Sequence, residues 1–170
     1  ARMNRIKEIE LTKLFSPRLN YDLSYLLERI KEWNIPEGVT KKEEIQERAI
    51  SWIVSQGYRP IRKGELSILD LAETISLPKT IWERPEMQQY LLSCIKNDHY
   101  VDMVLESLKI LREYSTETAH QLCTLTEMRQ MGVKMIKSPL LYCEFKKVAY
   151  IRESFELTNE ELEASFRKEI

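Results

Sequence analysis

Glycine and proline are scarce in this sequence: four glycines and six prolines occur among 170 residues. Tight β-turns depend on these two residue types, so a fold built from many hairpins is disfavoured. No stretch stays apolar for the ~18 residues that a membrane-spanning helix needs, and the N-terminus has no signal-peptide core. We therefore expect a cytoplasmic protein that reaches membranes only through partners.

An excess of charge of either sign is also missing. Lysine and arginine number 26 against 27 aspartates and glutamates, which gives a net charge of −1. No global field attracts the chain to nucleic acid, so any such site must be a local patch. The three cysteines, Cys94, Cys123 and Cys143, have no close pairs. This spacing predicts reduced, mostly buried thiols rather than disulfides.

Motifs of catalysis and metal binding are absent too. The two histidines, His99 and His120, have no partners at metal-ligand spacing. The sequence contains no GxxxxGK[ST], GxGxxG or GxSxG pattern, so phosphate-binding loops and nucleophile elbows have no support. We predict a protein that is not an enzyme, with no catalytic residue, cofactor or metal. A small helical enzyme would require a deep pocket that holds His99 or His120 beside a carboxylate.

Apolar residues at helical spacing are what the sequence does contain. The stretch Met87–Glu113 indicates two helices joined by a polar hinge at residues 96–98, and we expect it to be the centre of the core. The other predicted elements are a helix at Asn4–Phe15, one at Pro17–Trp33, one from the capping box Thr40–Glu43 to Gly57, one at Glu65–Ser76, a single turn holding Trp82 between Pro78 and Pro85, one at Ser115–Lys137, one from Ser138-Pro139 to Phe155, and one from a second capping box, Thr158–Glu161, to Ile170.

These elements predict an all-α fold, a helical bundle or a short stacked helical array of seven to nine helices. The length of 170 residues fits a single helical domain, residues 1–170. Because the chain starts at Ala1 and stops at Ile170 inside an expected helix, we interpret it as a segment of a longer protein.

One loop combines basic and aromatic side chains. Tyr58, Arg59, Arg62 and Lys63 lie between Gly57 and Gly64. Arginine offers planar, bidentate donors, so these four residues are the candidate contact for phosphate or for an acidic partner. The alternative is an ordinary solvated loop.

Two stretches resemble a known family. The first is LDLAETISLP with LLSCIKNDHYVDMVLESL, residues 69–78 and 91–108, and the second is FKKVAYIRESFELTNEELEASFRKE, residues 145–169. They are similar to the eighth-subunit family of the conserved oligomeric Golgi complex, helical-rod proteins that tether vesicles. The resemblance implies stacked helices, no catalysis, and binding to sister subunits, SNAREs or Rab proteins at the Golgi membrane.

We therefore predict a non-enzymatic helical protein-interaction or scaffold domain, in its specific version a vesicle-tethering subunit of intra-Golgi protein transport. Its partners would be other protein subunits that bind helix faces. This predicts a contiguous exposed apolar patch along a helix pair. The alternative is a helical domain of an RNA- or nucleic-acid-associated replication or polymerase assembly. In that case the basic loop would share one face with Lys134, Lys137, Lys146 and Lys147.

Overall fold

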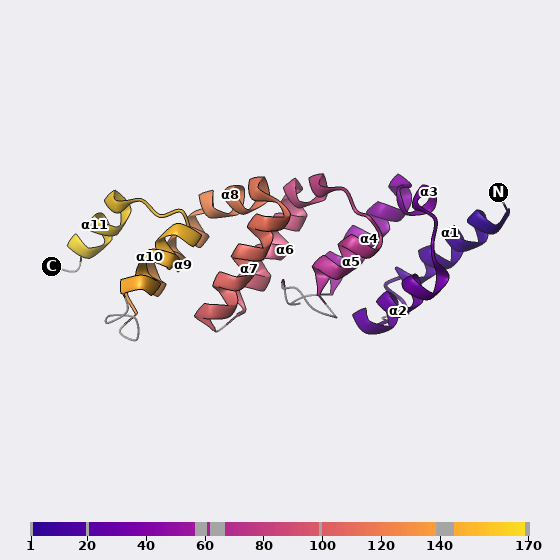
Figure 1. Ribbon diagram of the computed structural model, residues 1–170, viewed down its shortest axis with the longest axis horizontal. Helices are drawn as coiled ribbons and strands as arrows, with labels where there is room; N and C mark the ends of the chain where they lie inside the picture. Colours follow the sequence, from indigo (N-terminus) through magenta and orange to yellow (C-terminus); the bar gives the residue numbers. More distant parts are fainter. Residues whose placement is uncertain are drawn as a thin grey trace. The chain divides into compact units, whose positions relative to one another are not determined.

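The computed structural model describes residues 2–19, 21–56, 61, 67–98, 100–138 and 145–168, and of Phe145 the backbone only. These residues contain α-helices, one 3-10 helix and no strand, which confirms the all-α prediction (Figure 1). The elements are α1 (Arg2–Leu14), α2 (Leu23–Trp33), α3 (Glu37–Thr40), α4 (Glu43–Ser55), α5 (Ile68–Thr74), η1 (Lys79–Glu83), α6 (Pro85–Lys96), α7 (Val101–Tyr114), α8 (Thr116–Thr124), α9 (Thr126–Ile136), α10 (Phe145–Ser154) and α11 (Asn159–Arg167).

The predicted count of seven to nine helices is wrong, because the described residues alone contain eleven α-helices. The stretch Ser115–Lys137 forms two helices, since Leu125 has an extended backbone (φ −67°, ψ 132°). The short helix α3 was also missed. A third correction concerns the start of α2, which begins at Leu23, where the Asp22 side chain accepts a hydrogen bond from the Tyr25 N–H at 2.8 Å.

Contacts group the chain into two compact units, residues 1–97 and 98–170. The boundary falls in the predicted hinge, so the two arms of Met87–Glu113, α6 and α7, belong to different units. Both arms bury the predicted faces, for example Leu91 in α6 and Leu108 in α7. Each arm thus contributes to the core of its own unit. The prediction of one domain stays a prediction.

In the first unit, α1 contacts α2, α3 and α4, while α4 also contacts α6 and α2 contacts α5. Its largest fully buried side chains are Trp52 in α4 and Trp82 in η1. Trp82 is the tryptophan of the predicted single turn between two prolines, and the 3-10 helix η1 confirms that turn. Helix α6 packs against both η1 and α4, the two elements that contain the buried tryptophans.

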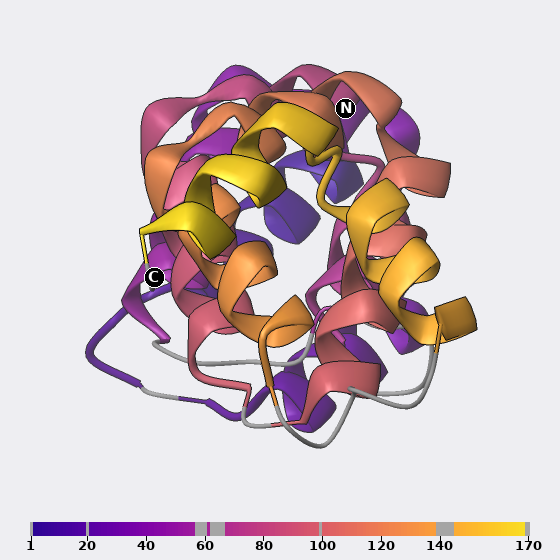
Figure 2. The same ribbon diagram turned by 90° about the vertical axis from the view of Figure 1, so that its left-hand side faces the viewer.

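In the second unit, α7 contacts α8, α8 contacts α9, and α9 contacts α10, which also returns to α7. The core contains Leu111, Ala119, Leu122, Met128 and Phe155, all with no exposed surface. Helix α11 is different because it buries no residue (yellow in Figure 2). Each other helix of this unit in the described residues buries at least one apolar side chain, for example Ile151 in α10.

Two helices end in the same way. After α5, Ser76 adopts φ 51°, and the Leu77 N–H donates to the Ala72 carbonyl at 2.9 Å. After α10, Glu156 adopts φ 54°, and the Leu157 N–H donates to the Arg152 carbonyl at 2.9 Å. This six-to-one hydrogen bond with a left-handed residue is the Schellman motif. In both cases the following leucine is buried, so the motif turns the chain sharply back onto its unit.

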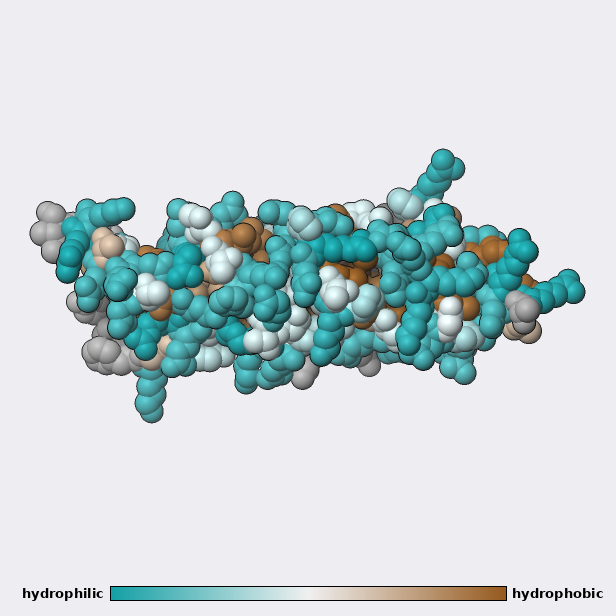
Figure 3. Space-filling view, turned by 90° about the horizontal axis from the view of Figure 1, so that it is seen from above, coloured by the Kyte–Doolittle hydropathy of each residue, from teal (hydrophilic) through white to brown (hydrophobic). Residues whose placement is uncertain are grey.

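Hydrophilic residues cover most of the face seen in Figure 3, with small brown areas between them. Eight large apolar side chains stay exposed among the described residues, and three of them lie on one helix, α1. The largest group of exposed apolar side chains among the described residues therefore lies on a single helix, and the other five are on separate segments.

Candidate functional site: a groove between helices α9 and α11

The predicted contact residues Tyr58, Arg59, Arg62 and Lys63 lie outside the described residues. Within that loop only Ile61 is described, and it is buried. The structure therefore leaves the basic loop as a prediction. The concave surface that it does describe in the second unit lies elsewhere, between α9 and α11.

Helix α9 has two faces with different roles. Its inner face contains Met128, Gly132 and Ile136, all buried. At Gly132 a Cβ atom would lie 2.7 Å from the Phe155 Cγ, so α9 approaches the α10 end closely at this point. The opposite face carries Thr126, Gln130, Val133 and Lys137 at helical spacing, and these residues line the groove.

Helix α11 is held at one end of the groove by an ion pair between Arg129 and Glu161, in which the guanidinium Nε and Nη2 each donate to a carboxylate oxygen. The same carboxylate completes the predicted Thr158–Glu161 capping box, which the structure confirms. Hydrogen bonding from Arg129, the largest cause, and from Thr158 together lower the pKa of Glu161 to about 2, against the opposing effect of burial. Glu161 is thus ionised at neutral pH.

At the other end of the groove, Lys137 joins the two helices. Its ammonium group donates to the Ser165 carbonyl at 2.9 Å and lies 5.4 Å from the centre of the Phe166 ring. The two connections, through Arg129 and through Lys137, are polar, and α11 buries no side chain between them. Consequently α11 stands away from α9 and leaves an open space.

That space has a volume of about 780 Å³. Its lining combines the Val133 side chain with three cations, Arg129, Lys134 and Lys137, and one anion, Glu161. Glu161 pairs with Arg129, and Lys137 donates to the Ser165 carbonyl. Lys134 is exposed and has no ion pair within the part of the chain that the structure describes. The groove therefore combines one apolar side chain, Val133, with an exposed cation, Lys134, near the C-terminal end of α9.

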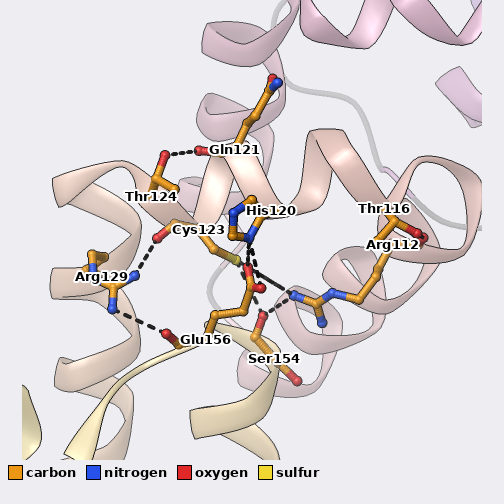
Figure 4. A network of polar contacts seen from close by, with 9 residues as sticks. All are labelled: Arg112, Thr116, His120, Gln121, Cys123, Thr124, Arg129, Ser154 and Glu156. Carbon is orange, nitrogen blue, oxygen red and sulfur yellow. Dashed lines mark hydrogen bonds and ion pairs between the residues drawn. The ribbon is translucent and has the colours of Figure 1, made fainter.

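A network of polar contacts fixes the segment that leads into α11 (Figure 4). Arg112 donates to the Ser154 carbonyl at 2.8 Å, and Arg129 donates to the Cys123 carbonyl at 2.9 Å and to the Glu156 carbonyl at 3.2 Å. These bonds connect the end of α10 to α7, α8 and α9. Because the same Arg129 also binds Glu161, the network sets the position of α11 beside α9.

His120 belongs to this network rather than to a catalytic pocket. Its Nδ1 lies 3.0 Å from a carboxylate oxygen of Glu156, and its side chain is 59% exposed. His120 does not line the groove between α9 and α11 or the hollow between α1 and α4. His99 lies outside the described residues. Over the described ranges no three histidine, cysteine, aspartate or glutamate side chains come together as metal ligands.

Cys94 and Cys123 are free, buried thiols, as predicted, while Cys143 lies outside the described residues. Burial, together with the nearby negative charge of Glu156, raises the pKa of Cys123 to about 12. A thiol with so high a pKa stays protonated at neutral pH and is a poor nucleophile. Cys123 therefore serves as a small core residue.

The lysines expected on a nucleic-acid-binding face are in different settings. Lys134 and Lys137 line the groove, whereas Lys147 in α10 pairs with Asp102 in α7 at 3.3 Å. The ion pair compensates the charge of Lys147. The expected contribution of the loop at residues 57–64 rests almost entirely on residues outside the described ones.

Sequence reasoning missed this groove for a physical reason. The prediction of one long helix over Ser115–Lys137 did not include the change of direction between α8 and α9. In addition, the ion pair between Arg129 and Glu161 joins residues 32 positions apart and leaves no periodic pattern in the sequence. The available signal was the face of α9 opposite Gly132, where Val133 is the one apolar residue among polar ones.

Comparisons with protein-family models, with curated proteins and with solved structures each found no match. None of the described helices has the length and apolar content needed to cross a lipid bilayer.

Proposed function

We propose that this chain is a non-enzymatic protein-interaction or scaffold domain that binds a partner helix in the groove between α9 and α11. The observation that carries this proposal is the groove itself: an open space of about 780 Å³ between two helices that Arg129 and Lys137 connect through polar contacts. Grooves between helices are a recurring docking site for the apolar face of a third helix.

The groove lining indicates the kind of helix that fits. The lining face of α9 runs from Thr126 to Lys137, which is about 16 Å at the rise of an α-helix. A partner of about three turns matches this length. It would place an apolar side chain on Val133 and acidic side chains near Lys134 and Lys137. The preferred partner is thus a short amphipathic helix with acidic residues toward one end.

The specific version of the proposal is a vesicle-tethering subunit of intra-Golgi transport. It rests on the resemblance of residues 69–78, 91–108 and 145–169 to the Golgi-tether family. The last of these stretches includes α11, which forms one side of the groove. The partners would then be sister subunits, SNAREs or Rab proteins, and the location the cytoplasmic surface of Golgi membranes.

The experiment is a quantitative co-purification of the full-length protein from its own cells. The Val133→Glu variant places a negative charge on the floor of the groove. The matched control is Val54→Glu, the same change at an exposed valine of α4 in the first unit. We expect the wild type and the control to recover the same proteins and Val133→Glu to lose at least one of them.

Recovery of the same proteins with Val133→Glu would contradict the groove as the binding site. If RNA co-purifies instead and leaves as the salt concentration rises, the nucleic-acid alternative would replace the scaffold proposal. The identity of a protein lost from the Val133→Glu sample decides the specific version: a Golgi-tether component supports it, and a polymerase component overturns it.

A further inference from the structure

Helix α1 turns apolar side chains outward. Met3, Ile6 and Ile9 are 65%, 48% and 47% exposed, while Leu11 and Leu14 of the same helix are buried. Leaving three large apolar side chains of one helix in contact with water costs free energy. The stripe that they form is therefore a candidate for contact with another surface.

Some charged side chains of α1 bind groups of the first unit, and others are exposed without an ion pair among the described residues. Lys7 donates to the Asn34 carbonyl at 3.2 Å, and Glu8 pairs with Lys42, so these two are used inside the first unit. Lys13 pairs with Glu10 along the helix. Arg2 and Arg5 are exposed, and neither has an ion pair among the described residues. The outward stripe is thus bordered by uncompensated positive charge, and α1 as a whole has four basic and two acidic residues.

Helix α11 shows the complementary pattern. It buries no residue, and its Phe166 is 47% exposed even with Lys137 beside the ring. The helix has three glutamates and one arginine, which gives it a net charge of −2 against +2 for α1. Glu160 is exposed and has no ion pair in the described part of the chain, and Glu163 is paired only with Arg167 along the helix.

We propose that the basic apolar face of α1, formed by Arg2, Met3, Arg5, Ile6 and Ile9, binds the acidic apolar face of α11, formed by Glu160, Glu163 and Phe166, in a second copy of this chain. The contact joins two different surfaces and is therefore heterologous. Each copy has one α1 face and one α11 face, so it contacts up to two other copies. Complexes larger than a dimer therefore form as the concentration rises. The proposal does not depend on the groove beside Val133.

Charge complementarity is the reason for choosing a second copy over an anionic membrane surface. Lipid head groups would explain the arginines of α1 and leave the exposed glutamates and Phe166 of α11 without a role. A second copy accounts for both helices at once. Opposite charges at the edge of an apolar contact also fix its register and exclude wrong pairings.

The test uses two variants that each block one surface. Ile6→Glu places an acid in the α1 stripe, facing the glutamates of α11. Phe166→Arg removes the exposed ring of α11 and adds a positive charge facing the arginines of α1. The matched controls are Val54→Glu and Tyr150→Arg, the same kinds of change at exposed positions of α4 and α10 in the same two units. Circular dichroism of all four variants checks that they remain helical.

Analytical ultracentrifugation over about a hundredfold range of concentration gives the molar mass. We expect the wild type and both controls to rise to the mass of a dimer or above, and each blocked variant to stay monomeric, with association about tenfold weaker or more. An equimolar mixture of the two blocked variants should form a dimer and nothing larger, because it retains one open α1 face and one open α11 face. Added salt should weaken the association.

A wild type that stays monomeric over this range would overturn the proposal. So would blocked variants that associate as the wild type does, or a mixture that remains monomeric. Sedimentation with anionic vesicles of phosphatidylserine and phosphatidylcholine distinguishes the lipid alternative. Binding that Ile6→Glu removes, with a monomeric wild type, would assign the α1 stripe to a membrane surface instead.

Discussion

Gly132 shows how a single residue sets the distance between two helices. A Cβ atom there would lie 2.7 Å from Phe155 Cγ and 2.9 Å from Phe155 Cβ, and 3.0 Å from Leu157 Cδ1. These contacts are shorter than carbon atoms tolerate, and Phe155 is fully buried and unable to move away. A glycine inside a helix ordinarily lowers the stability of that helix. In the structure Gly132 is the residue that lets α9 pack on the end of α10.

We expect Gly132→Ala to lower the free energy of unfolding by about 1–3 kcal/mol through overpacking. The higher helix propensity of alanine, about 1 kcal/mol, offsets part of this cost. Urea denaturation of the purified chain measures the change. Gln130→Ala, at an exposed position of the same helix, is the control and should leave the stability almost unchanged. A Gly132→Ala protein as stable as the wild type would show that α9 and α10 are less closely packed than described.

Arg129 connects three segments through one side chain. It binds the Cys123 carbonyl, the Glu156 carbonyl and both carboxylate oxygens of Glu161. Hydrogen bonding to this carboxylate raises the pKa of Arg129 still further above its usual range. Since α11 buries no residue, this ion pair is a main connection between α11 and the rest of the unit.

We expect Glu161→Gln to weaken the attachment of α11 by about 1 kcal/mol, which corresponds to about fivefold faster amide hydrogen exchange in that helix. The pKa of Glu161 is lowered from 4.5 to about 2, so its stabilising effect is complete above pH 4.5 and is lost as the pH falls toward 2. The difference between the variant and the wild type should shrink over the same pH interval.

Glu163→Gln is the control for this measurement, because Glu163 pairs only with Arg167 on the exposed side of the same helix. It should change the exchange rates of α11 much less. Equal effects of the two substitutions at pH 7 would mean that general charge on α11, rather than the Arg129 pair, holds the helix.

At the scale of elements, the capping signals divide into a correct one, a wrong one and a missed one. The Thr158–Glu161 box forms as predicted. The Thr40–Glu43 box does not, because Thr40 ends the short helix α3 and its hydroxyl donates to the Glu37 carbonyl at 3.1 Å, which makes Lys42 the N-cap of α4. A capping box was missed at Ser67–Asp70. A glycine inside α3, Gly38, concealed that helix in the sequence.

The division of Ser115–Lys137 into α8 and α9 had no local signal. Leu122, Leu125 and Met128 keep a regular apolar spacing across the break, and no glycine or proline lies near it. Leu125 leaves the helical conformation where α8 gives way to α9, and Leu122 and Met128 are both fully buried. Tertiary packing overrides local propensity here, and a single sequence does not reveal it.

The Schellman turn after α5 offers a test at the same scale. Ser76 adopts φ 51°, a region that costs a residue with a Cβ about 1 kcal/mol and costs glycine little. The Ser76 side chain is exposed. We expect Ser76→Gly to raise the free energy of unfolding by several tenths to about 1 kcal/mol, measured by urea denaturation. The control is Ser55→Gly in the last turn of α4, which should destabilise the protein. A loss of stability with Ser76→Gly would contradict the left-handed turn.

At the scale of the whole molecule, sequence periodicity predicted the helical class and the buried faces of α6 and α7, because both depend on local spacing. It did not predict where the contacts divide into units, since that depends on which helices meet. The division at residues 97 and 98 coincides with the polar hinge, so the hinge separates two cores.

The groove between α9 and α11 is likewise a property of the second unit rather than of any one helix. The close contact at Gly132 fixes α9 against the end of α10. The polar network at residues 154–158 sets the direction of the chain that leads into α11. The polar contacts of Glu161 and Lys137 then connect α11 to α9 and leave an open space between them. No single helix carries the signal. The residues that form the groove are spread over separate helices, and the open space exists only when these helices pack together.

Site-specific photo-crosslinking in cells tests the central claim most directly. A photoreactive amino acid replaces Val133 on the floor of the groove, and the matched control carries it at the exposed position 54. We predict a covalent adduct with a partner protein at position 133 and none with that partner at position 54, with the crosslinked peptide forming an acidic amphipathic helix. An absence of protein adducts at position 133, or the same adducts at both positions, would contradict the proposed function.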